Sequence, residues 1–232
     1  MDLLLLSNSR GPDGRYLAHG LEAIAKLAGN RRKAVFVPFA GVTTAPEDYT
    51  RNVQDALALA GINVTSVIAA GPADMQCRAV AEAELILVGG GNTFQLLKKC
   101  RENGLLQAIA AAVRAGTPYI GWSAGTNLAC PTISTTNDMP IVDPGGFDAL
   151  GLVDFQINPH YTNTLPQGHR GERRDQRIAE FLVAHPEGSV IGLPEGDWLQ
   201  VDNGRTVLHG PFEAKRFISG GDVQTLRPGC TL

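Results

Sequence analysis

The chain has 232 residues, enough to bury a large core, and this length lies within the usual range of a single α/β domain. Its formal net charge of -3 gives no basic field to attract a nucleic-acid backbone, and the sequence contains no arginine-rich or lysine-rich tail. We therefore expect no nucleic-acid partner.

The N-terminal segment and the cysteines exclude further classes of protein. Asp2 stands where a signal peptide needs basic residues, and the apolar run after it is too short to cross a membrane. The cysteines are scattered without C-x-x-C spacing, so neither a zinc site nor a disulfide framework is indicated; they are Cys77, Cys100, Cys130 and Cys230. We expect a cytoplasmic protein with buried thiols, no metal, no cofactor and no membrane partner.

The first half of the chain alternates between apolar runs and helical segments. The apolar runs indicate buried strands at residues 3–6, 34–37, 64–68, 85–88 and 119–121. Helices are predicted at residues 16–27, 47–60, 72–82, 93–101 and 106–115, and glycines such as Gly61 and Gly116 stand where helices should end. This alternation predicts a parallel sheet built from βαβ units. A helix of small residues follows, and then an irregular loop at residues 132–146 of a kind that often carries function.

The second half of the chain predicts shorter strands and one more helix. Strands are expected at residues 155–157, 190–193, 199–201, 206–208 and 214–218, and an amphipathic helix at residues 173–184. Asn203-Gly204 is a strong hairpin signal between two of these strands. We therefore expect an antiparallel edge on a mostly parallel sheet. No linker or repeat interrupts the chain, which predicts one domain over residues 1–232.

The segment Gly121-Trp122-Ser123-Ala124-Gly125 has the G-x-S-x-G form of a nucleophile elbow. It follows an apolar run and precedes the helix of small residues. In such an elbow the serine lies on a strained turn between strand and helix, and the glycines leave room for the backbone and the substrate. The bare pattern is common, but its context makes Ser123 a candidate nucleophile and a serine hydrolase the first hypothesis.

A nucleophilic serine needs a base, and His160 is the preferred candidate among the histidines. It directly follows the strand predicted at residues 155–157, so it is expected at the same carboxyl edge of the sheet as Ser123. His169 is the second candidate. The others have structural explanations in a helix, at a helix end and in a hairpin; they are His19, His185 and His209.

Two acids compete for the place behind the base, where a carboxylate fixes the tautomer of the histidine. Glu195 follows the apolar strand at residues 190–193, which brings it to the same edge of the sheet. Asp138 lies in the loop after the elbow, where an Asx-turn is the structural alternative. The order of the residues alone does not choose between them, and we prefer Glu195.

The glycines after the strand at residues 85–88 are candidates for an oxyanion hole. Gly89-Gly90-Gly91 offers backbone N–H groups with no side chain in the way, and the amide of Ala124 follows the nucleophile. We assign the two donors to Gly91 and Ala124. A phosphate-binding loop is the alternative, but the segment has neither G-x-G-x-x-G spacing nor a Gly-Lys-Ser/Thr ending.

Taken together, these segments closely resemble the aspartyl dipeptidases of peptidase family S51, and they run in order through nearly the whole chain. Besides the elbow and the strand that opens the chain, the matching segments are Ser7-Asn8-Ser9, Pro38-Phe39-Ala40-Gly41-Val42, Gly89-Gly90-Gly91-Asn92-Thr93-Phe94-Gln95, Thr136-Asn137-Asp138-Met139-Pro140, Asn158-Pro159-His160 and Leu193-Pro194-Glu195-Gly196. The resemblance implies a three-layer fold like that of class I glutamine amidotransferases, with helices on both faces of the sheet and serine as nucleophile.

The resemblance also implies a metal-independent serine dipeptidase that cleaves peptides with an N-terminal aspartate. Ser123 and His160 match the family's nucleophile and base, whereas the family has been described with its acid at either of the positions that match Asp138 and Glu195. We expect Glu195 to orient His160, and Asp138 to support the site or to contact the α-amino group of the substrate.

An aspartyl substrate brings a carboxylate that an arginine can bind with two hydrogen bonds. The basic stretch at residues 169–177 begins just after the loop of His160, and we select Arg174 or Arg177 from it; a solvated helix face is the structural alternative. The expected partner is a small dipeptide, and the protein is expected to be a monomer or a homodimer. A cyanophycinase of the same family and a non-catalytic binding protein on this fold are the alternative functions.

Overall fold

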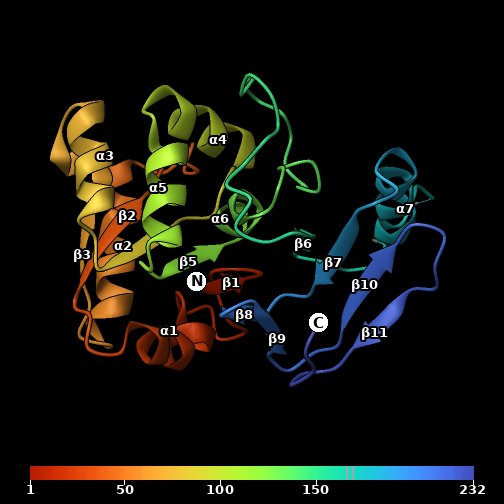
Figure 1. Ribbon diagram of the computed structural model, residues 1–232. Helices are drawn as coiled ribbons and strands as arrows, with labels where there is room; N and C mark the ends of the chain where they lie inside the picture. The colour runs from red at the N-terminus through yellow and green to blue at the C-terminus, as the bar shows by residue number, and fades with distance from the viewer. Residues whose placement is uncertain (166, 169) are drawn as a thin grey trace.

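In the computed structural model, residues 1–165, 167–168 and 170–232 are described, and the candidate base His169 lies outside them. A seven-stranded sheet with the order β3-β2-β4-β5-β1-β8-β9 forms the centre of the molecule (Figure 1). Its strands are β1 (Asp2–Leu6), β2 (Lys33–Val37), β3 (Asn63–Ser66), β4 (Leu85–Val88), β5 (Tyr119–Trp122), β8 (Trp198–Asp202) and β9 (Arg205–His209). The first five strands pair in parallel, as the sequence predicts.

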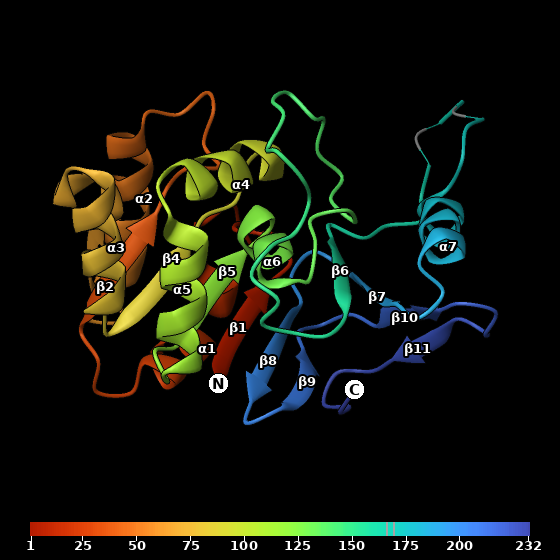
Figure 2. The same ribbon diagram turned by 45° about the horizontal axis from the view of Figure 1, so that its top comes forward.

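Helices cover both faces of this sheet, which confirms the predicted layers. One face packs against α3 (Ala73–Ala81), α4 (Thr93–Glu102), α5 (Leu105–Arg114) and α6 (Ala124–Ala129), and the other against α1 (Leu21–Ala28) and α2 (Pro46–Ala58). Figure 2 shows α4, α5 and α6 together in front of the strands. Along β1, Leu3 and Leu5 enter the first core while Leu4 and Leu6 enter the second, because successive strand residues point to opposite faces. Within the described residues, no helix has the length and apolar content to cross a membrane.

The C-terminal strands differ from the prediction of one sheet. β8 and β9 extend the central sheet as an antiparallel edge, but a second sheet has the order β11-β10-β7-β6 and lies beyond them with α7 (Arg174–Ala184) (Figure 1). Its strands are β6 (Gln156–Pro159), β7 (Ser189–Leu193), β10 (Ala214–Ile218) and β11 (Gln224–Leu226). Apolar runs give the strands but not their pairing partners, so the sequence did not reveal this division.

The second sheet shares a core with the first. Ile157, Ile191 and Ala214 from the second sheet are buried in the same cluster as Leu3 of β1 and Tyr119 of β5. The two sheets therefore bury apolar side chains in one continuous cluster.

A smaller difference concerns the strand predicted at residues 64–68. The strand β3 ends at Ser66, and a 3-10 helix, Val67–Ala70, follows. The hydroxyl of Ser66 accepts a hydrogen bond from the amide of Ile68 at 3.3 Å, which caps the 3-10 turn.

Candidate active site

Ser123 lies between β5 and α6 with φ 52° and ψ -110°, a backbone conformation that residues other than glycine rarely adopt. Its amide donates to the carbonyl of Leu6 at 3.1 Å, which fixes the turn to β1. The flanking glycines have no room for a side chain. A Cβ on Gly121 would lie 2.6 Å from the carbonyl oxygen of Gly125, and a Cβ on Gly125 would lie 2.1 Å from that of Val88. The G-x-S-x-G pattern therefore forms the strained elbow that the sequence predicts.

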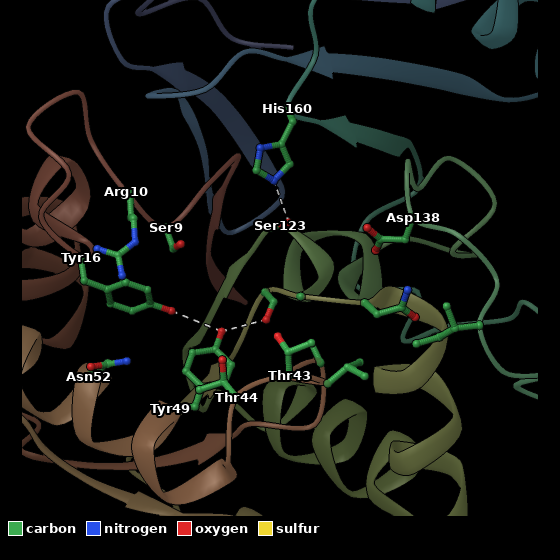
Figure 3. A pocket seen from close by; sticks show the side chains of 17 residues that line it. Ser9, Arg10, Tyr16, Thr43, Thr44, Tyr49, Asn52, Ser123, Asp138 and His160 are labelled. Carbon is green, nitrogen blue, oxygen red and sulfur yellow. Dashed lines mark hydrogen bonds between the residues drawn. The ribbon is translucent and has the colours of Figure 1, made fainter.

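A chain of hydrogen bonds joins Ser123 to His160 and Glu195. The Nε2 atom of His160 lies 2.8 Å from Oγ of Ser123, and its Nδ1 atom lies 2.6 Å from Oε1 of Glu195. Figure 3 shows the ring of His160 directed at Ser123 across the mouth of a pocket. The Glu195 side chain is 63% exposed, so water reaches the carboxylate of this pair.

The two residues behind Ser123 come from the second sheet. His160 follows β6 and Glu195 follows β7, and because these strands are parallel their carboxyl ends lie at the same edge. The expectation that Ser123, His160 and Glu195 share one sheet is therefore wrong, although the three side chains do meet. The site forms where the carboxyl end of β5 in the central sheet approaches the carboxyl ends of β6 and β7 in the second sheet.

Ser7 and Asn8, at the end of β1, hold the loops that carry His160 and Glu195. The Ser7 hydroxyl accepts a hydrogen bond from the amide of His160 at 2.8 Å and donates to the carbonyl of Leu193, the last residue of β7, at 2.8 Å. The Asn8 side chain accepts from the amide of Gly196 at 2.8 Å. Both side chains are buried. Sequence reasoning gave them no role, although polar residues directly after a buried strand were a usable signal.

Asp138 does not contact His160 in the described structure. Its Oδ2 atom accepts hydrogen bonds from the amide of Thr93 at 2.7 Å, from the Thr93 hydroxyl at 2.5 Å and from the Thr136 hydroxyl at 3.1 Å. The carboxylate therefore lies at the N-terminus of α4, where the helix dipole favours negative charge. No hydrogen bond to its Oδ1 atom occurs among the described residues, and Asp138 lines the pocket beside Ser123.

The glycine loop after β4 passes directly against the serine. A Cβ on Gly90 would lie 2.9 Å from Cβ of Ser123, and a Cβ on Gly91, whose φ is 134°, would lie 2.2 Å from the carbonyl oxygen of Ala40. The backbone hydrogen bonds of the described residues include none from the amide of Gly91 or of Ala124. Both amides are thus available beside Ser123.

The pocket is a cavity of about 600 Å³ with Ser123 and His160 in its wall. Its lining comes from the segment after β1, the loop after β2, helix α2, the glycine loop and the loop before β6. The members besides Ser123 and His160 include Ser9, Arg10, Tyr16, Val42, Thr43, Thr44, Tyr49, Asn52, Asn92, Asp138 and Ile141. Such a volume is at the scale of a small-ligand site. No local pattern singles out Arg10, because a single basic residue in a turn is usually a solvated surface group.

The two arginines selected from the sequence occupy different environments, and neither lines this cavity. A guanidinium nitrogen of Arg174 donates to Oδ1 of Asn137, and the Asn137 amide donates in turn to the carbonyl of Pro159, next to His160, at 2.7 Å. Partial burial, and then the charge of Arg177, lower the pKa of Arg174. Arg177 is exposed and lies 3.9 Å from the carboxylate of Glu172. Arg174 therefore lies close to the site, whereas Arg177 faces solvent.

His185, His209 and the four cysteines lie outside the wall of this pocket. His185 ends α7 and packs on the ring of Phe181, and His209 ends β9 and stacks on Trp198. All four cysteines are free, and burial raises the pKa of Cys130 to about 12, so its thiol is neutral. Over residues 1–165, 167–168 and 170–232, no cluster of histidine, cysteine, aspartate or glutamate could hold a metal ion.

The sequence matches a known protein family and relatives over nearly its whole length. The model of peptidase family S51 matches residues 3–209. The chain is 57% identical over 231 residues to Peptidase E of Salmonella arizonae and 56% identical over 229 residues to Peptidase E of Citrobacter koseri, with 99% of each chain covered in both cases. Peptidase E of Salmonella typhimurium is 56% identical over 230 residues.

Solved structures share the fold at lower sequence identity. A peptidase from an acI-B1 actinobacterium superposes with a TM-score of 0.70 at 16% identity, covering 100% of this chain and 96% of that one. A Listeria monocytogenes EGD-e protein provisionally described as a peptidase E superposes with a TM-score of 0.69 at 23% identity, covering 91% of this chain and 98% of that one. The matched family model, the identity with relatives over the whole chain and the shared fold agree: the chain belongs to peptidase family S51.

Proposed function

We propose that the protein is a serine dipeptidase that hydrolyses peptides with an N-terminal aspartate. The observation that carries the proposal is the hydrogen-bonded chain from Ser123 through His160 to Glu195, at a strained elbow in a member of peptidase family S51. The curated relatives named Peptidase E, at 56–57% identity over the whole chain, support the same activity.

In the proposed reaction, Oγ of Ser123 attacks the scissile carbonyl carbon while Nε2 of His160 takes the hydroxyl proton. The carbonyl π electrons move to the oxygen, and the amides of Gly91 and Ala124 donate hydrogen bonds to the resulting oxyanion. His160 then gives the proton to the leaving amine, the C–N bond breaks, and an acyl-enzyme remains on Ser123. A water molecule, deprotonated by His160, then attacks the acyl carbon; the bond from this carbon to Oγ of Ser123 breaks, His160 returns the proton to Oγ, and the aspartate is released.

Glu195 acts on His160 and not on the substrate. Its carboxylate accepts the Nδ1–H of the ring, which leaves Nε2 as the acceptor that faces Ser123. The negative charge also stabilises the imidazolium that forms when the serine proton arrives. Asp138, which has no contact with the ring among the described residues, is assigned to the substrate instead.

Recognition of the N-terminal aspartate is assigned to Asp138 and Arg174. The Oδ1 atom of Asp138 is available for the α-ammonium group, since the hydrogen bonds from Thr93 and Thr136 all go to Oδ2. Arg174 is partly buried on Asn137, next to Asp138, and would bind the aspartyl carboxylate through paired charge-assisted hydrogen bonds. Arg177 is the second candidate for the same role.

A panel of dipeptides tests this proposal. Asp-Leu, Glu-Leu, Asn-Leu and β-aspartyl-Leu are assayed with the wild-type protein and with Ser123→Ala, which keeps the fold but lacks the nucleophile. We expect hydrolysis of Asp-Leu that Ser123→Ala abolishes, together with labelling of Ser123 by a reactive phosphonate.

Equal hydrolysis of Asp-Leu and Asn-Leu would exclude a charged aspartyl subsite. Activity on cyanophycin without activity on Asp-Leu would favour the cyanophycinase alternative, and binding of Asp-Leu without turnover would favour a binding protein.

A further inference from the structure

The cavity beside Ser123 carries opposite charges on its two sides. Within the part of the lining that the structure describes, the residues with a fixed charge are Arg10 and Asp138. Figure 3 shows Arg10, with Ser9 and Tyr16, on one side of Ser123 and Asp138 on the other. A zwitterionic dipeptide also carries opposite charges on the two sides of its peptide bond.

Arg10 is held in place by its own turn. An isolated β-bridge pairs Arg10 with Tyr16, and a guanidinium nitrogen of Arg10 donates to the carbonyl of Gly14 at 2.7 Å. The guanidinium carbon lies 5.3 Å from the centre of the Tyr16 ring, within the range of a cation–π contact. These contacts limit the freedom of a long side chain, so less conformational entropy is lost when a ligand binds.

The turn is also joined to the catalytic loops. The hydroxyl of Tyr16 donates to that of Tyr49 at 3.2 Å, and Tyr49 donates to the carbonyl of Gly90 at 2.9 Å. The indole N–H of Trp122, the residue before Ser123, donates to the same Tyr49 hydroxyl at 3.1 Å. Arg10 therefore has a defined position relative to the nucleophile and the glycine loop.

The positive charge of Arg10 has no carboxylate within 4.0 Å among the described residues. Asp13, in the same turn, pairs with Arg15 at 2.6 Å instead. A guanidinium has five N–H donors, and the hydrogen bond to Gly14 uses one of them. The remaining donors can bind a carboxylate with two parallel hydrogen bonds.

From this arrangement we infer that Arg10 binds the C-terminal carboxylate of the dipeptide, on the leaving-group side of Ser123. This assignment rests on the proposed function. When the α-ammonium group lies at Asp138 and the scissile carbonyl at Ser123, the second residue extends toward Arg10. A longer peptide would place a neutral amide at the guanidinium, so Arg10 selects dipeptides over longer substrates.

The test compares Asp-Leu with Asp-Leu amide, which differ in the C-terminal charge. For the wild-type protein we expect kcat/KM to be about 10- to 100-fold higher for the free acid, the scale of a charge-assisted hydrogen-bonded pair. Arg10→Ala should lose this preference by lowering kcat/KM for Asp-Leu while leaving the amide unchanged. Arg10→Lys keeps the charge without the planar fork and should give an intermediate preference. Arg15→Ala, in the same turn but on the exposed Asp13 pair, is the matched control and should keep the full preference.

Four results would overturn the assignment. An equal fall for both substrates in Arg10→Ala would mean that the turn acts on catalysis through structure, and an undiminished preference in that variant would mean that another group binds the carboxylate. Equal rates of the wild-type protein on acid and amide would reject a carboxylate subsite while leaving the proposed dipeptidase intact. Failure of the wild-type protein to hydrolyse either substrate would reject the proposed function itself, and Arg10's role with it.

Discussion

The hydroxyl of Ser7 accepts a hydrogen bond from the backbone amide of His160 at 2.8 Å, although the two residues belong to different sheets. Ser7 follows β1 of the central sheet, and His160 follows β6 of the second sheet. Because the same hydroxyl donates to Leu193 of β7, one buried side chain joins the loop of the base to the strand that precedes Glu195.

Ser7→Ala should lower kcat for Asp-Leu by about 10-fold with little change in KM. The variant leaves a backbone N–H and a carbonyl without their partner in a buried region, which costs about 1–3 kcal/mol of folding stability and loosens His160. The measurement is kcat and KM together with the urea midpoint. Ser219→Ala, at an exposed serine, is the control and should change neither. Unchanged kcat in a destabilised Ser7→Ala protein would show that the hydroxyl serves stability alone.

The roles of the two acids are separated by replacing each with its amide. Glu195→Gln keeps the size of the side chain but no longer favours the productive tautomer of His160, so we expect kcat to fall by at least about 100-fold and up to about 10⁴-fold. Asp138→Asn should keep kcat within about 10-fold and raise KM, since it weakens the site for the α-ammonium group. Steady-state kinetics on Asp-Leu measures both. Near-normal kcat in Glu195→Gln would reject the assignment of the acid.

Much of this site could be predicted from local sequence signals. Ser123 was identified by an elbow pattern that directly follows a strand, and Glu195 by its place at the end of an apolar run, and both signals extend over fewer than ten residues. The meeting of His160 with Ser123 was predicted for an incorrect reason. The prediction placed both in one sheet, whereas the pairing of β6 with β7 places the histidine in another.

The residues that the sequence did not reveal depend on contacts between distant segments. Arg10 reaches the cavity because its turn folds back on Tyr16, and Tyr16 in turn bonds Tyr49, which is 33 residues further along the chain. Ser7 acts on a residue 153 positions away. No local periodicity encodes such contacts. From its neighbours in the sequence, Arg10 is indistinguishable from a surface cation, and Ser7 from any polar residue at the end of a strand.

Arg174 and Arg177 lie on the same helix and give a matched pair for the aspartyl subsite. Arg174→Ala should raise KM for Asp-Leu by about 10-fold or more, because a charge-assisted pair with the aspartyl carboxylate is lost, while the slow hydrolysis of Asn-Leu should hardly change. Arg177→Ala removes an exposed charge 3.9 Å from Glu172 and should leave both substrates unaffected. Measuring kcat and KM for Asp-Leu and Asn-Leu with both variants shows which arginine binds the aspartyl carboxylate. The opposite result, with selectivity lost in Arg177→Ala, would move the subsite to Arg177.

The buried carboxyl of Asp197 should make folding stability depend on pH. Its side chain is fully buried, Oδ1 accepts from the amide of Phe212 at 3.0 Å, and Oδ2 has no partner among the described residues. Burial raises the pKa of this carboxyl from its ordinary value of 3.8 to about 6. Between these values the native state holds a proton that the unfolded state has released, so stability falls as pH rises through this window, by up to roughly 3 kcal/mol.

Asp197→Asn cannot ionise and should lack this loss. The free energy of unfolding of Asp197→Asn minus that of wild type should therefore increase by about 1–3 kcal/mol between pH 4 and pH 7, because the wild type loses stability over this range and the variant does not. Urea unfolding followed by tryptophan fluorescence at both pH values measures the difference, and comparison with wild type at each pH removes the contribution of the other titrating groups. Asp202→Asn, at an exposed aspartate that ends β8, is the control and should show no such trend. A difference that stays constant with pH, or grows in favour of wild type as pH rises, would mean that Asp197 is ionised in the folded protein at pH 4.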